Sequence, residues 1–157
     1  MEIRSATTND ADAASEVLRR SITHLCVADH GHDPTILARW LANKTPAQFR
    51  DWIASDRQCV LVAVEDGTVL GVGSVTTDGR IGLNYVAPEA RFRGASKAML
   101  VALEEHARHF GATHCVLEST ATARRFYLSA GYADSAAPIR MFGAVSYPMI
   151  KRLAPGQ

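Results

Sequence analysis

The stretch YVAPEARFRGASK, residues 85–97, decides the fold because the hydrophobic pattern changes its period there. Residues 81–86, which lead into this stretch, are β-rich, and Pro88 ends the strand that they predict. From residue 94 to residue 110 the apolar side chains instead recur every three to four positions, the spacing of one helix face. The stretch therefore predicts a strand, a loop, and a helix that starts near Gly94 and ends before Gly111.

Working outward, the chain before residue 55 is mostly helical, after a short strand at 2–6. The first helix runs to about residue 26. Two more helices follow the caps Asp33 and Thr45, each with a proline at its first position. Residues 58–64, 69–76 and 81–86 predict an antiparallel meander. A strand at 114–118, a helix at 121–130 and one or two strands within 139–153 complete the order. We expect one α/β domain over residues 1–157, with a mixed, mostly antiparallel central sheet of six to seven strands flanked by about four to five helices.

Charge and composition argue against several kinds of partner. The 157 residues carry 17 Lys and Arg against 16 Asp and Glu, a formal charge of +1, whereas nucleic-acid binders are strongly basic. The longest apolar run, residues 59–64, is far shorter than the roughly 20 residues that span a membrane, and the N-terminus is charged where a signal peptide is apolar. Three widely spaced cysteines indicate reduced thiols. We therefore expect a cytoplasmic protein that binds neither nucleic acid nor a membrane.

The loop that follows the third meander strand is a candidate anion site. Backbone N–H groups at a helix N-terminus favour negative charge, and Arg91 and Arg93 add positive charge. Gly94, Ala95 and Ser96 are small, so a bulky anion can approach the backbone. The alternative is an ordinary strand-to-helix turn with a solvated arginine pair.

A second stretch, ARRFYLSAGY at residues 123–132, places a phenol on a short helix. The hydroxyl of Tyr127 could donate a proton to a departing thiolate, which would make it a general acid. The alternative is a core tyrosine that packs beside Phe126.

Together the two stretches resemble motifs of the GNAT superfamily of acetyl-CoA-dependent N-acetyltransferases. Residues 91–100, after Val86-Ala87-Pro88, resemble its motif A, and residues 123–132 resemble its motif B. The resemblance covers the whole chain and implies the GNAT fold. Ser96 departs from the usual Gly or Ala, and Thr120 stands where Asn is common.

The resemblance implies that acetyl-CoA is the acetyl donor, as a cosubstrate, and that Tyr127 protonates the coenzyme A thiolate. The pyrophosphate would lie on the amides around Arg91, Arg93, Gly94, Ala95, Ser96 and Lys97. The pantetheine arm would pair with the strand edge at Asn84, Tyr85 and Val86 and contact Thr120, which faces this edge across the splayed strands.

The base that takes the proton of the amine is not identified, because residues 80–86 contain no Glu, Asp or His. Glu118, at the end of the fifth strand, is one candidate base, and it could equally be a surface carboxylate. The polar loop after the first helix offers Asp29, His30 and His32 as acceptor-binding residues or bases, or as solvated side chains. A base is unnecessary if the amine arrives neutral or loses its proton to water. The spacing of this loop matches no usual zinc pattern, so no metal is expected.

The sequence therefore predicts an N-acetyltransferase in which a primary amine of a small molecule or peptide attacks the thioester directly. The competing interpretation is a non-catalytic acyl-CoA-binding regulatory module with the same fold, since the third meander strand lacks a base. A homodimer is possible by analogy with similar folds.

Overall fold

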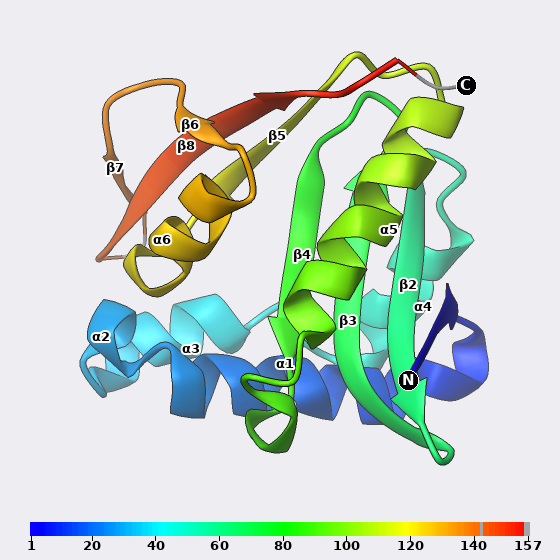
Figure 1. The fold of residues 1–157 in the computed structure, drawn as a ribbon. Helices are drawn as coiled ribbons and strands as arrows, with labels where there is room; N and C mark the ends of the chain where they lie inside the picture. Colours follow the sequence, from blue (N-terminus) through cyan, green and yellow to red (C-terminus); the bar gives the residue numbers. More distant parts are fainter. Residues whose placement is uncertain (142, 156–157) are drawn as a thin grey trace.

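The computed structural model describes residues 1–141 and 143–155, with two sheets and helices on both faces of the first (Figure 1). The strands are β1 (Glu2–Ser5), β2 (Gln58–Glu65), β3 (Thr68–Thr76), β4 (Ile81–Val86), β5 (His114–Ser119), β6 (Ala133–Asp134), β7 (Ile139–Met141) and β8 (Ala144–Arg152). The α-helices are α1 (Ala11–Leu25), α2 (Val27–His30), α3 (Pro34–Leu41), α4 (Pro46–Ala54), α5 (Ala95–His109) and α6 (Ala121–Ser129), with short 3₁₀ helices at Thr8–Asp10 and Pro88–Ala90.

The first sheet contains the meander that the sequence predicts. Its order is β1-β2-β3-β4, and all its neighbouring strands are antiparallel. The register pairs Val62 with Val72 between β2 and β3, and Gly73 with Asn84 between β3 and β4. The mixed, mostly antiparallel α/β class is confirmed, and β4 forms one edge of this sheet.

The second sheet contains β5, β8 and β6 in that order, with β7 paired to the far part of β8. The described residues thus form eight strands in two sheets, where the sequence predicts six to seven in one. Two of the strands are too short to show a period, since β6 has two residues and β7 has three. No helix in the described part of the chain is long and apolar enough to cross a membrane.

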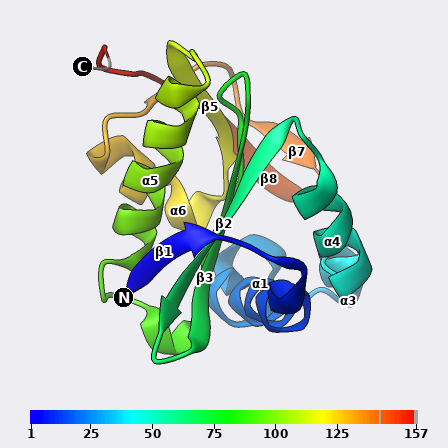
Figure 2. The same cartoon turned by 90° about the vertical axis from the view of Figure 1, so that its right-hand side faces the viewer.

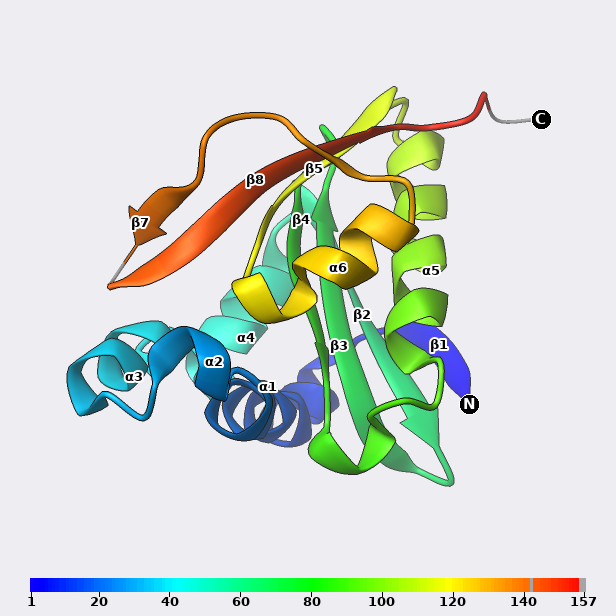
Figure 3. The ribbon, with the colours of Figure 1, turned by 60° about the vertical axis from the view of Figure 1, so that its left-hand side comes forward.

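The two sheets meet at one end of β4 and β5 and diverge toward the other (Figures 1 and 3). The junction is a single parallel bridge between Arg80 and Val116, where Val116 N–H donates to the Gly79 carbonyl at 3.0 Å. A Cβ on Gly79 would lie 2.2 Å from the His114 carbonyl oxygen, so only glycine permits this approach. Beyond the bridge, the edge of β4 facing β5 is left without a strand partner among the described residues.

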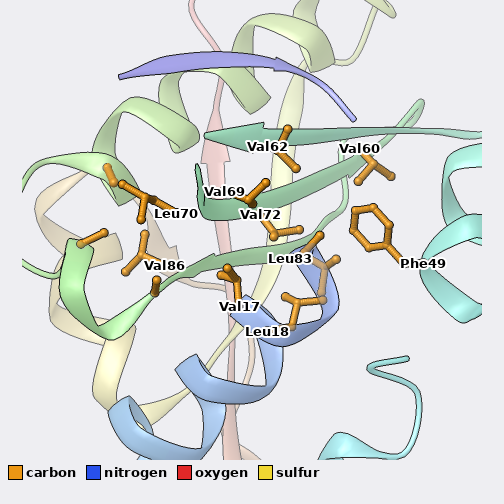
Figure 4. Packing of buried hydrophobic residues seen from close by; sticks show 14 of the residues in the cluster. Val17, Leu18, Phe49, Val60, Val62, Val69, Leu70, Val72, Leu83 and Val86 are labelled. Atoms are coloured by element: carbon orange, nitrogen blue, oxygen red, sulfur yellow. The ribbon is translucent and has the colours of Figure 1, made fainter. Parts of the chain in front are cut away.

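Apolar side chains alternate across the first sheet and form one core on each face. Figure 2 shows α5 on one face of this sheet and α1 and α4 on the other. Val60 and Val62 point toward α1 and α4, whereas their neighbours Leu61 and Ala63 belong to the core under α5. Phe49 of α4 is fully buried in the first of these cores (Figure 4). Leu83 and Val86 of β4 belong to the first core and Ile81 to the second, so β4 is packed on both faces.

Candidate active site

Two cavities lie in the gap between the diverging strands, and they share Tyr85 of β4 and Thr120 at the end of β5. The first, which we call the α5 cavity, measures about 360 Å³ and lies beside the N-terminus of α5. The second, the α3 cavity, measures about 580 Å³ and lies between α3, the ends of β4 and β5, and the start of β8. The gap therefore contains two adjoining cavities, one beside the start of α5 and the other beside α3.

The α5 cavity collects most of the residues that the sequence singles out for cofactor binding, together with the candidate acid. These are Asn84, Tyr85, Val86, Arg91, Gly94, Ala95, Ser96, Lys97, Thr120 and Tyr127. They come from β4, the loop before α5, the first turn of α5, and α6, which are far apart in sequence.

The N-terminus of α5 differs from those of α3, α4 and α6. Asp33, Thr45 and Thr120 each accept a hydrogen bond from a backbone N–H of the helix that they precede, whereas Gly94 provides no side-chain cap for α5. Gly94 has φ +81°, a left-handed conformation that a side chain would strain. No acidic residue lies in the first turn of α5, so its free amides are suited to an anionic ligand.

Arg93 is an exception among the predicted loop residues, because the structure does not bring it to the α5 cavity. Its guanidinium pairs with Glu65 Oε2 at 2.5 Å, and its amide donates to the Ala90 carbonyl at 3.4 Å. The attraction of the Glu65 carboxylate thus turns Arg93 away from the cavity. Arg91 lies instead over the ring of Phe92, 4.6 Å from its centroid, and stays within the cavity wall.

Tyr127 is both packed in the core and part of the cavity wall. It is 7% exposed, and its ring meets Phe126 and Tyr132 edge to face at centroid distances of 5.1 and 5.6 Å. Burial raises the pKa of Tyr127 to about 12, with the nearby Asn84 amide acting in the opposite direction. The phenol is therefore protonated at neutral pH, as a proton donor must be.

Asn84 contributes a buried polar atom without a partner. Its Oδ1 is fully shielded from solvent and accepts no hydrogen bond from the described residues. An unsatisfied buried acceptor raises the free energy of the fold unless a ligand supplies a donor. Because Asn84 lines the α5 cavity, a ligand with an N–H group would satisfy it.

The α3 cavity contains two of the predicted carboxylates, Glu118 and Asp29. Asp29 Oδ1 accepts from the Ala121 amide at 2.7 Å, and Oδ2 accepts from the Thr122 hydroxyl at 2.5 Å. Asp29 therefore caps α6 although it lies 92 residues before Ala121 in the sequence. The N-terminus of α6 stabilises its negative charge. Glu118 is exposed near the end of β5, and its side chain forms no hydrogen bond with the described residues.

The structure corrects the expectation for the loop after α1, which contains one helical turn, α2, in place of a purely irregular segment. His30 is only 1% exposed and does not line either cavity. Its Nε2 lies 2.9 Å from the Ile22 carbonyl, and its Nδ1 accepts from the His32 amide at 3.0 Å. His30 thus holds α1 and α2 together, and His32 is exposed outside both cavities.

Sequence reasoning missed several residues of the cavity walls. Lys44, Arg39 and Trp40 line the α3 cavity, and Cys26 and Phe126 line the α5 cavity. Lys44 is only 8% exposed although it follows the polar end of a short helix, so nothing in its local pattern indicates burial. Trp40 is half-buried, and its position in the apolar period of α3 allows it to face this cavity.

Comparisons with known proteins agree with this fold. No curated protein matches the sequence. A GCN5-related N-acetyltransferase from Rhodopseudomonas palustris is 23% identical, with a TM-score of 0.86 over 97% of this chain and 95% of that one. The PaiA N-acetyltransferase from Thermoplasma acidophilum, in complex with coenzyme A, is 19% identical, with a TM-score of 0.81 over 96% and 98%. The yncA protein from Salmonella typhimurium, with acetyl-CoA, is 23% identical, with a TM-score of 0.69 over 100% and 96%.

A family model matches the sequence itself and is therefore more direct evidence of the family than similarity of fold. The family model described as "Acetyltransferase (GNAT) domain" matches residues 26–153, which contain both stretches that resemble GNAT motifs, 91–100 and 123–132. The chain belongs to the GNAT acetyltransferase family.

Proposed function

We propose that this protein is an N-acetyltransferase that moves the acetyl group of acetyl-CoA to a primary amine. The observation that carries the proposal is the pair of cavities that meet at Tyr85 and Thr120 between β4 and β5. A transferase needs separate places for its donor and its acceptor that join where the group is transferred. The α5 cavity suits the donor, and the α3 cavity suits the acceptor.

The residues of the α5 cavity would suit the pyrophosphate and the pantetheine arm of coenzyme A. The uncapped amides of α5, with Arg91 and Lys97 beside them, would bind the pyrophosphate. The unpaired edge of β4 would bind the amides of the pantetheine arm as a further strand would. Asn84 Oδ1, which lacks a donor, would accept one of the arm's N–H groups. The likeness to structures that contain coenzyme A or acetyl-CoA supports this assignment.

Acetyl-CoA supplies a thioester whose carbonyl carbon is open to attack by an amine. The nitrogen forms a bond to that carbon, the carbon–sulfur bond breaks, and the sulfur leaves with the electron pair. Tyr127 would donate its hydroxyl proton to this thiolate, which its high pKa and its place in the α5 cavity permit. The proton lost by the amine balances the one gained by the sulfur, so the products are an amide and free coenzyme A.

Glu118 would take the proton of the amine, directly or through water. It lines the α3 cavity on the β5 side, and Ser119 and Thr120 continue that wall to the junction of the cavities. On β4, by contrast, Gly82 lines the same cavity and brings no side chain at all. Asp29 is less suited to this role because both of its oxygens already accept hydrogen bonds from α6.

The test is thiol release from acetyl-CoA over a panel of primary amines, with an amine-free blank and a calorimetric titration of acetyl-CoA. Release that depends on the amine, together with an acetylated product seen by mass spectrometry, supports the transferase. Binding of acetyl-CoA without transfer to any amine would favour the regulatory module, and no binding would refute the assignment of the α5 cavity.

A further inference from the structure

The α3 cavity contains a buried cation that has no anionic partner. Lys44 is 8% exposed, and its Nζ donates to the neutral Oδ1 of Asn43 at 2.5 Å. Within residues 1–141 and 143–155, no carboxylate lies within 4.0 Å of this ammonium. An ammonium has three N–H donors, and leaving it unpaired in a protein interior raises the free energy of the fold. Such a group is expected where an anion arrives from outside.

Arg39 and Lys44 give one part of the α3 cavity a positive charge that no carboxylate of the described residues pairs with. Arg39, one helix turn before Asn43, is exposed on the same wall and forms no ion pair with the described residues. The charge of Asp29 is already held by the amides at the start of α6. The remaining carboxylate, Glu118, comes from β5, whereas the two cations come from α3 and the segment after it.

We propose that the acceptor is a small amine that also bears a carboxylate, as an amino acid does, and that Lys44 binds this carboxylate inside the α3 cavity. Arg39 would assist from the rim, and the amine would point toward Glu118 and the junction with the α5 cavity. Trp40 and Ile36 provide apolar surface for the part of the acceptor between its two charges. The inference rests on the proposed function and names the class of its acceptor.

The alternative role for Lys44 is that of a general base, which requires its uncharged form. Burial lowers the pKa of Lys44 to about 8, so a fraction of the side chain is uncharged at mildly alkaline pH. A base acts on every acceptor alike, however, whereas a carboxylate-binding cation discriminates between acceptors. Matched acceptors therefore separate the two roles.

The experiment compares amino acids with their carboxamides, for example glycine with glycinamide and β-alanine with β-alaninamide. For the wild type we expect KM to be at least about tenfold lower for the best amino acid than for its carboxamide. Lys44→Met should raise KM for that amino acid about tenfold and change KM for the carboxamide less than about twofold. Lys44→Arg should restore part of the difference, and Arg57→Met, which removes an exposed cation outside both cavities, should change neither value.

A second readout does not depend on turnover. N-acetylglycine and N-acetylglycinamide, as the corresponding reaction products, are compared as stabilising ligands in thermal unfolding. Only the carboxylate form should raise Tm, and Lys44→Met should abolish the rise. Equal KM values for acids and amides, or an equal loss for both in Lys44→Met, would overturn the inference and leave the transferase intact. Failure of acetyl-CoA to bind in calorimetry would instead overturn the proposed function itself.

Discussion

The unpaired ammonium of Lys44 predicts that the free enzyme is destabilised in a pH-dependent way, and that Lys44→Met removes the effect. Burial lowers the pKa of this group from 10.5 to about 8, a difference of about 2.5 pH units. At about 1.4 kcal/mol for each unit, the charged side chain lowers the free energy of unfolding by about 3 kcal/mol. The penalty is complete below pH 8, where Lys44 is protonated in both the folded and the unfolded chain. It decreases as the pH rises from 8 toward 10.5, because the folded protein then loses this proton first.

Urea denaturation of the wild type and Lys44→Met at pH 7 and pH 10, without ligand, measures this effect. Other groups that titrate in this range, such as the buried Cys26 and Cys115 thiols whose pKa values are raised, are common to both proteins and cancel in the difference. We expect Lys44→Met to be the more stable protein at pH 7. Its advantage should decrease by about 2 kcal/mol by pH 10. A difference that stays constant between the two pH values would show that the ammonium is paired or hydrated in solution, and would refute the reasoning.

Three further predictions concern the cavities and α6. Tyr127→Phe keeps the ring but removes the proton donor, so turnover should fall by about 100-fold or more while calorimetry shows unchanged acetyl-CoA affinity; unaltered turnover would exclude Tyr127 from the mechanism. Gly94→Val forces a β-branched side chain into a left-handed conformation. It should lower the free energy of unfolding by about 1–2 kcal/mol and weaken acetyl-CoA binding at least about tenfold, and undiminished affinity would contradict the role of this loop. Asp29→Ala removes the long-range cap of α6 and should lower the free energy of unfolding by about 1 kcal/mol and speed hydrogen exchange at the Ala121 amide, and unchanged exchange would show that the cap is not formed in solution.

Local patterns in the sequence predict the elements and the α5 cavity well. The strand, loop and helix of residues 81–110 follow from a change of period, and the uncapped start of α5 follows from Gly94 within the same stretch. The longer strands also follow from the sequence, but their division between two sheets does not. The short strands β6 and β7 do not, since two or three residues are too few to show any period.

Side chains with distant partners explain the remaining differences. His30 looks like a solvated loop residue until the carbonyls at the end of α1 come within reach of its ring. Asp29 likewise finds its partners 92 and 93 residues later in the chain. Arg93 is part of a basic loop in sequence, but in space it meets Glu65 across 28 residues. No local pattern contains these contacts, because each depends on how the sheet brings separate segments together.

The contacts between Asp29 and α6 also help to fix the α5 cavity and the α3 cavity relative to each other. Thr120 caps α6 from within the chain, and Asp29 caps it from α2, so the helix that carries Tyr127 is tied to the wall of the α3 cavity. At the other end, the close approach at Gly79 allows the two sheets to meet at the bridge between Arg80 and Val116. The gap between β4 and β5 is thus closed at Gly79, bounded by α6, and open where the two cavities join.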